Sequence, residues 1–172
     1  VSVTGTATQG ETLGIDTGNL QGTLSYQWKR GASDIAGANA ANYTLVQADV
    51  GSTIKVVVTS DYNSYSVESG STGTVANVND PVTGTVTVDG TPKVSNELTA
   101  VTTNLSDPDG LGTFSYQWKR GTSDIAGATS DKYTLVDDDD GNNISVLVSY
   151  TDPQGAAESK ESASVSVSKP SL

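Results

Sequence analysis

The sequence predicts an all-β protein made of two tandem β-sandwich domains arranged end to end. Three observations support this fold class. Apolar residues alternate with a period of two, which is typical of half-buried strands. Glycine, asparagine and aspartate separate these stretches about every eight to twelve residues, as turns do. The chain also repeats itself once, and its 18 glycines and single phenylalanine among 172 residues suit turns and short strands better than helices.

The internal repeat defines the two domains. The segment GTLSYQWKRG at residues 22–31 returns as GTFSYQWKRG at residues 112–121, an offset of 90. Matches upstream of this segment have an offset of 85, so the second copy carries a five-residue insertion, Ser106–Gly110. We therefore predict one domain over residues 1–80 and a second over residues 81–172.

About seven strands are expected in each copy. In the first copy six of them centre on apolar positions, namely Val1/Val3, Leu13/Ile15, Leu24/Tyr26/Trp28, Tyr43/Leu45, Ile54/Val56/Val58 and Val75. Two antiparallel sheets packed face to face would bury this pattern. Trp28 and Trp118 have inward parity, so both are expected in the core. The basic pairs Lys29-Arg30 and Lys119-Arg120 at a strand end are expected to guard a sheet edge or aid solubility.

The composition excludes several function classes. The chain has no Cys and no His, so it contains no Cys/His zinc site, no disulfide and no Ser–His or Cys–His nucleophile. Its net charge of −11 disfavours nucleic acid and anionic membranes as partners. No apolar run is long enough to span a bilayer. The chain opens directly on a strand pattern, which favours a segment of a longer protein. We expect a non-enzymatic protein with no catalytic residues.

The third predicted strand carries a tryptophan, and an Asp-x-Gly turn at Asp49–Gly51 precedes the next alternating strand. This arrangement resembles the immunoglobulin-like sandwich, although the two cysteines and the usual corner tyrosine of that family are missing. The motifs SYQWKRG, DIAGA and YTLV, with an NVND linker, resemble the tandem Ig-like extender repeats of large RTX-type bacterial surface adhesins. That resemblance implies a monomeric, extracellular spacer on a bacterial surface, whose partners are neighbouring repeats of the same chain and whose distal ligand is unknown.

Acidic residues gather where two such domains would meet. In an Ig-like sandwich the B–C and F–G loops lie at the end where the chain enters, beside the preceding linker. Carboxylates brought together there repel one another unless a cation lies between them, and Ca²⁺ accepts scattered loop oxygens. We therefore predict a structural Ca²⁺ site that rigidifies the inter-domain junction, with ligands Asn79, Asp80, Asp107, Asp109, Asp152 and the facing Asp49. The alternative is that these residues are ordinary turn formers.

A second acidic stretch, residues 137–143, lies on the corresponding turn of the second domain. Asp137 and Asp139 could contribute to another metal site there. The D-x-D-x-G spacing is also found at the start of an EF-hand loop, but no glutamate follows at the twelfth position. A solvated acidic turn is an equal alternative.

The first domain differs at its leading end. It lacks the insertion, and its loop at residues 61–65 carries Tyr62 and Tyr65, which combine rigid aromatic area with hydrogen-bonding groups, as antibody loops do. The alternative function is therefore a carbohydrate- or protein-binding Ig-like module that uses this loop, either by itself or as an accessory to a secreted hydrolase.

Overall fold

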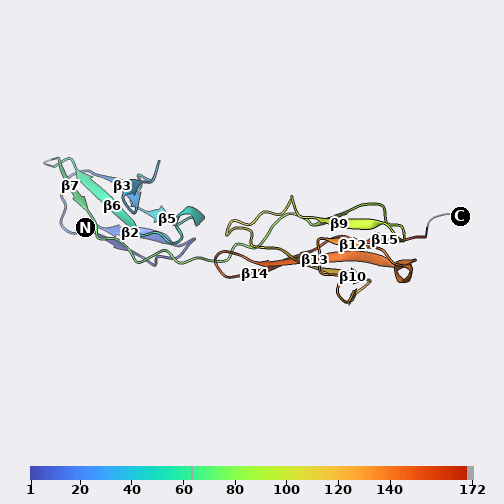
Figure 1. Ribbon diagram of the computed structural model, residues 1–172. Helices are drawn as coiled ribbons and strands as arrows, with labels where there is room; N and C mark the ends of the chain where they lie inside the picture. The colour runs from blue at the N-terminus through green and yellow to red at the C-terminus, as the bar shows by residue number, and fades with distance from the viewer. Residues whose placement is uncertain (63, 170–172) are drawn as a thin grey trace. The chain divides into compact units, whose positions relative to one another are not determined.

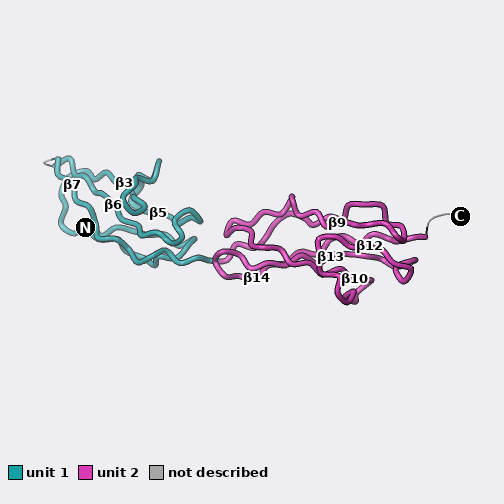
Figure 2. Tube along the Cα trace, viewed as in Figure 1, with its two compact units in different colours: residues 1–78 teal, residues 79–172 magenta. Residues whose placement is uncertain are grey.

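The computed structural model describes residues 1–62 and 64–169. Its internal contacts divide the chain into unit 1, Val1–Val78, and unit 2, Asn79–Leu172 (Figure 2). The boundary expected from the sequence lies two residues later, after residue 80. Each unit has its own hydrophobic core.

Unit 1 contains two antiparallel sheets (Figure 1). The first has the order β1 (Ser2–Thr4), β2 (Thr12–Asp16) and β5 (Tyr43–Thr44). The second has the order β4 (Ser33–Asp34), β3 (Leu24–Arg30), β6 (Ile54–Ser60) and β7 (Tyr65–Glu68). A 3-10 turn, η1 (Gln47–Asp49), precedes β6. Sequence neighbours β2 and β3 belong to different sheets, as strands B and C do in the immunoglobulin sandwich.

Unit 2 repeats this topology. One sheet has the order β12 (Lys132–Thr134), β9 (Glu97–Val101) and β8 (Thr87–Asp89). The other has the order β11 (Ser123–Asp124), β10 (Ser115–Arg120), β13 (Asn143–Thr151) and β14 (Ala157–Glu161), and β15 (Val165–Ser166) also pairs with β13. The turn η2 (Asp137–Asp139) corresponds to η1. The predicted all-β, Ig-like sandwich fold is thus confirmed for both units.

The cores follow the alternation of the central strands. Along β6, Ile54, Val56 and Val58 are fully buried, and Trp28 on β3 is the register partner of Val56. The indole nitrogen of Trp28 donates a hydrogen bond of 2.9 Å to the carbonyl of Ala40, so burial leaves no polar group of this side chain without a partner. Trp118 has the same burial and a matching bond to Ser130. Both tryptophans lie in the core, as predicted.

The two units differ at one end of the sandwich. This end carries the β2–β3 and β6–β7 loops in unit 1 and the β9–β10 and β13–β14 loops in unit 2. In unit 2 this end is closed by Phe114 and Tyr150, whose rings meet edge to face with centroids 5.6 Å apart. The repeat offset of 90 places Leu24 and Ser60 at these positions in unit 1. Unit 1 therefore has less side-chain volume where its core meets this end.

Candidate metal centre

Three carboxylates converge at the leading end of unit 2. Asp107 and Asp109 lie in the loop between β9 and β10, within the inserted segment, and Asp152 directly follows β13. One carboxylate oxygen from each lies within 4.8 Å of the others, and in the described part of the chain no other group of three acidic residues is placed this way. The structure therefore brings together three of the six predicted junction ligands, and all three belong to one unit.

Asp152 is the most constrained member of this cluster. Its side chain is 4% exposed. One oxygen, Oδ1, accepts hydrogen bonds from the backbone of Gln154 at 2.8 Å and Ala156 at 2.9 Å. The other oxygen, Oδ2, is buried and has no hydrogen-bond partner. Leaving a buried carboxylate oxygen unsatisfied costs free energy, so this atom is the one that a bound cation would satisfy.

Asp109 connects the cluster to the start of unit 2. It is 5% exposed, and its Oδ2 accepts a hydrogen bond of 2.8 Å from the backbone of Asp80. Its own backbone donates to Asp107 Oδ1 at 2.9 Å, and Gly110 donates to the Asp107 carbonyl at 3.0 Å. These turn bonds fix the loop with both carboxylates on the same side as Asp152.

Asp107 Oδ2 accepts a hydrogen bond from the hydroxyl of Tyr150. Burial of this phenol, aided by its bond to Asp107 and by the negative charges of Asp107, Glu158 and Asp152, raises the pKa of Tyr150 far above its usual value. The hydroxyl therefore stays protonated and remains a donor. Neither Asp107 nor Asp152 forms an ion pair with a lysine or arginine of the described residues, so no basic side chain offsets their charge directly.

The two linker residues predicted as ligands, Asn79 and Asp80, lie beside the cluster and are held by acidic side chains. Asp80 donates its backbone N–H to Asp109, as described, and Asn79 donates its side-chain amide to Glu158 Oε1 at 2.8 Å. The backbone of Val82 donates to the other oxygen of Glu158 at 3.3 Å. Glu158, on β14, was not predicted. Its only sequence signal is its place three residues after Gly155, which ends the Asp-Pro-Gln-Gly turn that begins at Asp152.

Asp49 has another role from the one predicted. It is fully buried in unit 1. Arg30 Nε donates to its Oδ1 at 2.7 Å, while Oδ2 accepts from the Tyr43 hydroxyl and the Val46 backbone, both at 2.9 Å. Because both oxygens are saturated by fixed donors, Asp49 belongs to the fold of unit 1, and the sequence prediction is corrected here.

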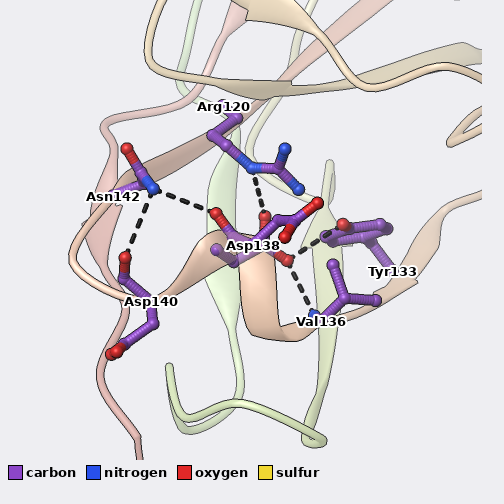
Figure 3. Close-up of polar contacts among 7 residues, drawn as sticks. Arg120, Tyr133, Val136, Asp138, Asp140 and Asn142 are labelled. Atoms are coloured by element: carbon purple, nitrogen blue, oxygen red, sulfur yellow. Dashed lines mark hydrogen bonds and ion pairs between the residues drawn. The ribbon is translucent and has the colours of Figure 1, made fainter.

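Asp139 occupies the equivalent place in unit 2 and requires the same correction. Arg120 Nε donates to its Oδ1 at 2.7 Å, and Tyr133 and the Val136 backbone donate to Oδ2 at 2.9 and 2.8 Å. In Figure 3 dashed lines lead from Arg120, Tyr133 and Val136 to the carboxylate of Asp139, the residue drawn without a label. Its side chain is fully buried, and the arginine provides the charge that a metal would otherwise supply.

The remaining acids of residues 137–143 form no group of three carboxylates in the described part of the chain. Asp137 has an 83% exposed side chain, and its carboxylate and that of Asp140 each lie 3.9 Å from the amine of Lys169. Asn142 instead ties the turn together by donating to the carbonyls of Asp138 at 3.0 Å and Asp140 at 3.3 Å (Figure 3). A metal shared by Asp137 and Asp139 is therefore not supported, and this stretch is an acidic turn built around one buried carboxylate.

The predicted role of the arginines in the two basic pairs, at a sheet edge or in solubility, was also wrong. Arg30 and Arg120 anchor the buried carboxylates instead of guarding an edge, and the hydrogen bond to Asp49 raises the pKa of Arg30. Burial, with the bond to Asp49, raises the pKa of Tyr43 to about 12. The signal for these networks was present in the repeat, because an arginine, a tyrosine and an aspartate recur together at the offset of 90.

Tyr62 and Tyr65 lie at the equivalent end of unit 1 and are 63% and 60% exposed. They line one hollow together with Leu20 and Ser60. Asn63, within the predicted loop, lies outside the described residues.

Comparisons with known proteins show similarity of fold only. No family model and no curated protein matches the chain. Among solved structures, an ICAM-5 D1–D4 ectodomain fragment is 12% identical, with a TM-score of 0.45, over 98% of this chain and 53% of that one. The mouse nectin-like molecule 4 ectodomain is 11% identical, with a TM-score of 0.40, over 99% and 64%. Three N-terminal domains of the bacteriophage RB49 highly immunogenic outer capsid protein are 20% identical, with a TM-score of 0.33, over 88% and 52%.

The chain thus spans between about half and two thirds of the length of these structures. Among the described residues, no helix has the length and apolar character needed to cross a bilayer.

Proposed function

We propose that this chain is a non-enzymatic, extracellular structural segment, a spacer from a bacterial surface adhesin, that binds Ca²⁺ at the leading end of unit 2. Asp107, Asp109 and Asp152 are the protein ligands. The observation that carries the proposal is the buried Oδ2 of Asp152, which has no hydrogen-bond partner and lies in a cluster of three carboxylates. Two tandem sandwiches with repeated motifs support the spacer role.

The donor set fits calcium. The three side chains offer carboxylate oxygens only, and the chain contains no histidine or cysteine, so a soft or borderline metal has no preferred ligand here. Ca²⁺ accepts six to eight oxygens in flexible geometry, and loop carboxylates with nearby carbonyls and water are its usual partners. The ion would supply positive charge to the cluster and satisfy the Asp152 oxygen.

Neutralising this cluster would also order the first residues of unit 2. At an effective dielectric constant of about 20, two carboxylates at this separation repel by roughly 3 kcal/mol. Asp109 also holds the backbone of Asp80, and Glu158 holds Asn79. The loop that carries Asp109 is thus coupled to Asn79 and Asp80, the first residues of unit 2. When a cation relieves the repulsion between the carboxylates, both the loop and these residues are held in place. Because Asn79 directly follows unit 1, we expect this to restrict the linker, which is what a spacer needs.

Calcium titration by calorimetry, paired with thermal unfolding in calcium and in chelator, tests this proposal. We expect binding, and a rise in stability of about 2.7 kcal/mol when free calcium is 100-fold above Kd. Asp152→Asn removes one charge from the site and should weaken binding by about tenfold or more. Asp137→Asn, an exposed acid outside the cluster, is the matched control and should bind normally. Identical melting curves in calcium and chelator would rule the site out.

A further inference from the structure

Both exposed aromatic side chains of the described chain lie in one place. Tyr62 and Tyr65 are more than half exposed, whereas the other aromatic residues are buried or half-buried. They line a pocket of about 320 Å³ in unit 1, whose lining residues are Asn19, Leu20, Gln21, Ser60, Tyr62 and Tyr65. Exposed apolar area gathered around a hollow is typical of a ligand site.

The pocket exists because unit 1 leaves the end of its sandwich open. Ser60 follows Val58 on the core-facing side of β6, and it is the register partner of Tyr65 on β7. Paired residues share a face of the sheet, so Tyr65 lies on the core-facing side where the core ends. In unit 2, Tyr150 occupies the place of Ser60 and fills this space by packing on Phe114. A serine in place of a tyrosine opens the pocket.

The walls of the pocket are fixed by hydrogen bonds. The Ser60 hydroxyl donates to the carbonyl of Gln21 and accepts from the backbone of Tyr62 at 3.1 Å. Asp61 Oδ1 accepts from the backbone of Thr23 at 2.7 Å, which joins the two loops. Gly22, at φ +88°, allows this close approach, since a Cβ there would lie 2.3 Å from Asp61 Oδ1. Loops whose backbone is held in this way lose little backbone conformational entropy when a ligand binds.

The chemistry of the lining residues defines the class of ligand. None of the six lining side chains is charged, so a neutral ligand is favoured. Two tyrosine rings and Leu20 offer apolar faces, and amides and hydroxyls offer donors and acceptors. The volume lies at the small end of ligand pockets, roughly 300–1,000 Å³. A pyranose matches all three properties, since its ring has an apolar C–H face, a rim of hydroxyls and no charge. A peptide would need an extended groove.

We propose that this pocket of unit 1 binds the terminal sugar of a neutral glycan. This function is additional to the spacer role and independent of calcium, because the metal ligands belong to unit 2. By the repeat offset, the places of Tyr62 and Tyr65 are taken in unit 2 by Asp152 and Gly155. On these two proposals, the corresponding loop binds a metal ion in unit 2 and a sugar in unit 1.

An array of neutral oligosaccharides ending in glucose, galactose, mannose or N-acetylglucosamine, with sialylated and sulfated glycans for comparison, tests the proposal on the whole chain. Hits are quantified by NMR titration with the matching methyl glycoside up to millimolar concentrations. We expect neutral glycans to bind equally in calcium and in chelator. Tyr62→Ala/Tyr65→Ala should weaken binding by about tenfold or more at unchanged melting temperature.

Two further variants sharpen the result. Tyr62→Phe/Tyr65→Phe keeps the rings and should retain most of the affinity, while Leu111→Ala, which truncates an exposed apolar side chain of unit 2, should have no effect. The proposal is overturned if no neutral glycan shifts NMR signals at millimolar concentration, if binding survives the double alanine change, or if only charged glycans or peptides bind. Loss of calcium binding would leave it standing, so the two proposals fail separately.

Discussion

The hydroxyl of Tyr150 donates a hydrogen bond to Asp107 Oδ2, so the hydrophobic core of unit 2 ends directly on its carboxylate cluster. The ring of the same tyrosine packs edge to face on Phe114. Packing of the sandwich and geometry of the acidic loops are therefore linked through one side chain.

Tyr150→Phe should separate these two contributions. The ring contact is kept, but Asp107 loses a donor in a poorly solvated site, which costs about 1–3 kcal/mol in chelator. Saturating calcium should reduce this loss, because a cation can replace the missing donor. Urea unfolding in both buffers measures the effect, with Tyr26→Phe in unit 1 as the control. An equal loss in both buffers would argue against a cation at Asp107.

Asp109→Asn should disconnect the cluster from the first residues of unit 2. Its Oδ2 holds the backbone of Asp80, and removal of its charge weakens the proposed metal site. In small-angle scattering, the unaltered chain should sample a narrower range of dimensions in calcium than in chelator, because the linker is restricted. The variant should give the broader distribution in both buffers. Asp137→Asn should behave like the unaltered chain, and a calcium response retained by Asp109→Asn would contradict the mechanism.

Arg120→Ala should destabilise unit 2 far more than loss of a surface charge. It leaves Asp139 fully buried without its ionic partner, which costs about 3 kcal/mol. Asp139→Asn alone should also be destabilising, and the double change should cost less than the sum because the two residues interact directly. Chemical denaturation of all three variants completes the cycle. Lys169→Ala, which removes an exposed partner of Asp137, should change stability by no more than about 0.5 kcal/mol.

Unit 1 should lose stability at alkaline pH. The pKa of Tyr43 is about 12 in the folded chain, against an ordinary value of 10.0. Between these values the unfolded chain releases the proton while the folded chain keeps it, so the stabilisation is complete below pH 10 and falls as pH rises towards 12. Absorbance at 295 nm should show several late-titrating tyrosines, Tyr43 and Tyr150 among them, and Tyr43→Phe should reduce that late signal by one tyrosine. That variant should also show a smaller fall in melting temperature over this range.

The sequence was sufficient for the sandwich fold and for the convergence of three of the predicted acidic residues. Strict alternation around Trp28 and Trp118 defined the central strands, since one residue of slippage would have exposed the core. Asp107, Asp109 and Asp152 could be placed together because chain order in an Ig-like sandwich puts their loops at one end. That argument needs topology alone and no knowledge of side-chain contacts.

The same reasoning failed for Asp49 and Asp139 because their roles depend on tertiary contacts. An aspartate in a turn is a solvated cap, a metal ligand or half of a buried ion pair, depending on which side chain reaches it. Here Arg30 and Arg120 reach them from strands 19 residues earlier. In unit 1 the sequence indicated the loop of Tyr62 and Tyr65 but not the pocket beside it, because the difference between Ser60 and Tyr150 matters only once the register places Tyr65 opposite Ser60.

The five-residue insertion, Ser106–Gly110, has a wider consequence. Two near-copies share the same sheets, the same tryptophan and the same buried arginine–aspartate pair, yet their loops at one end differ completely. The loops of such repeats can therefore differ while the sandwich stays the same. Grafting the β9–β10 loop and the β13–β14 loop of unit 2 onto unit 1 should transfer the carboxylate cluster without any change to the strands.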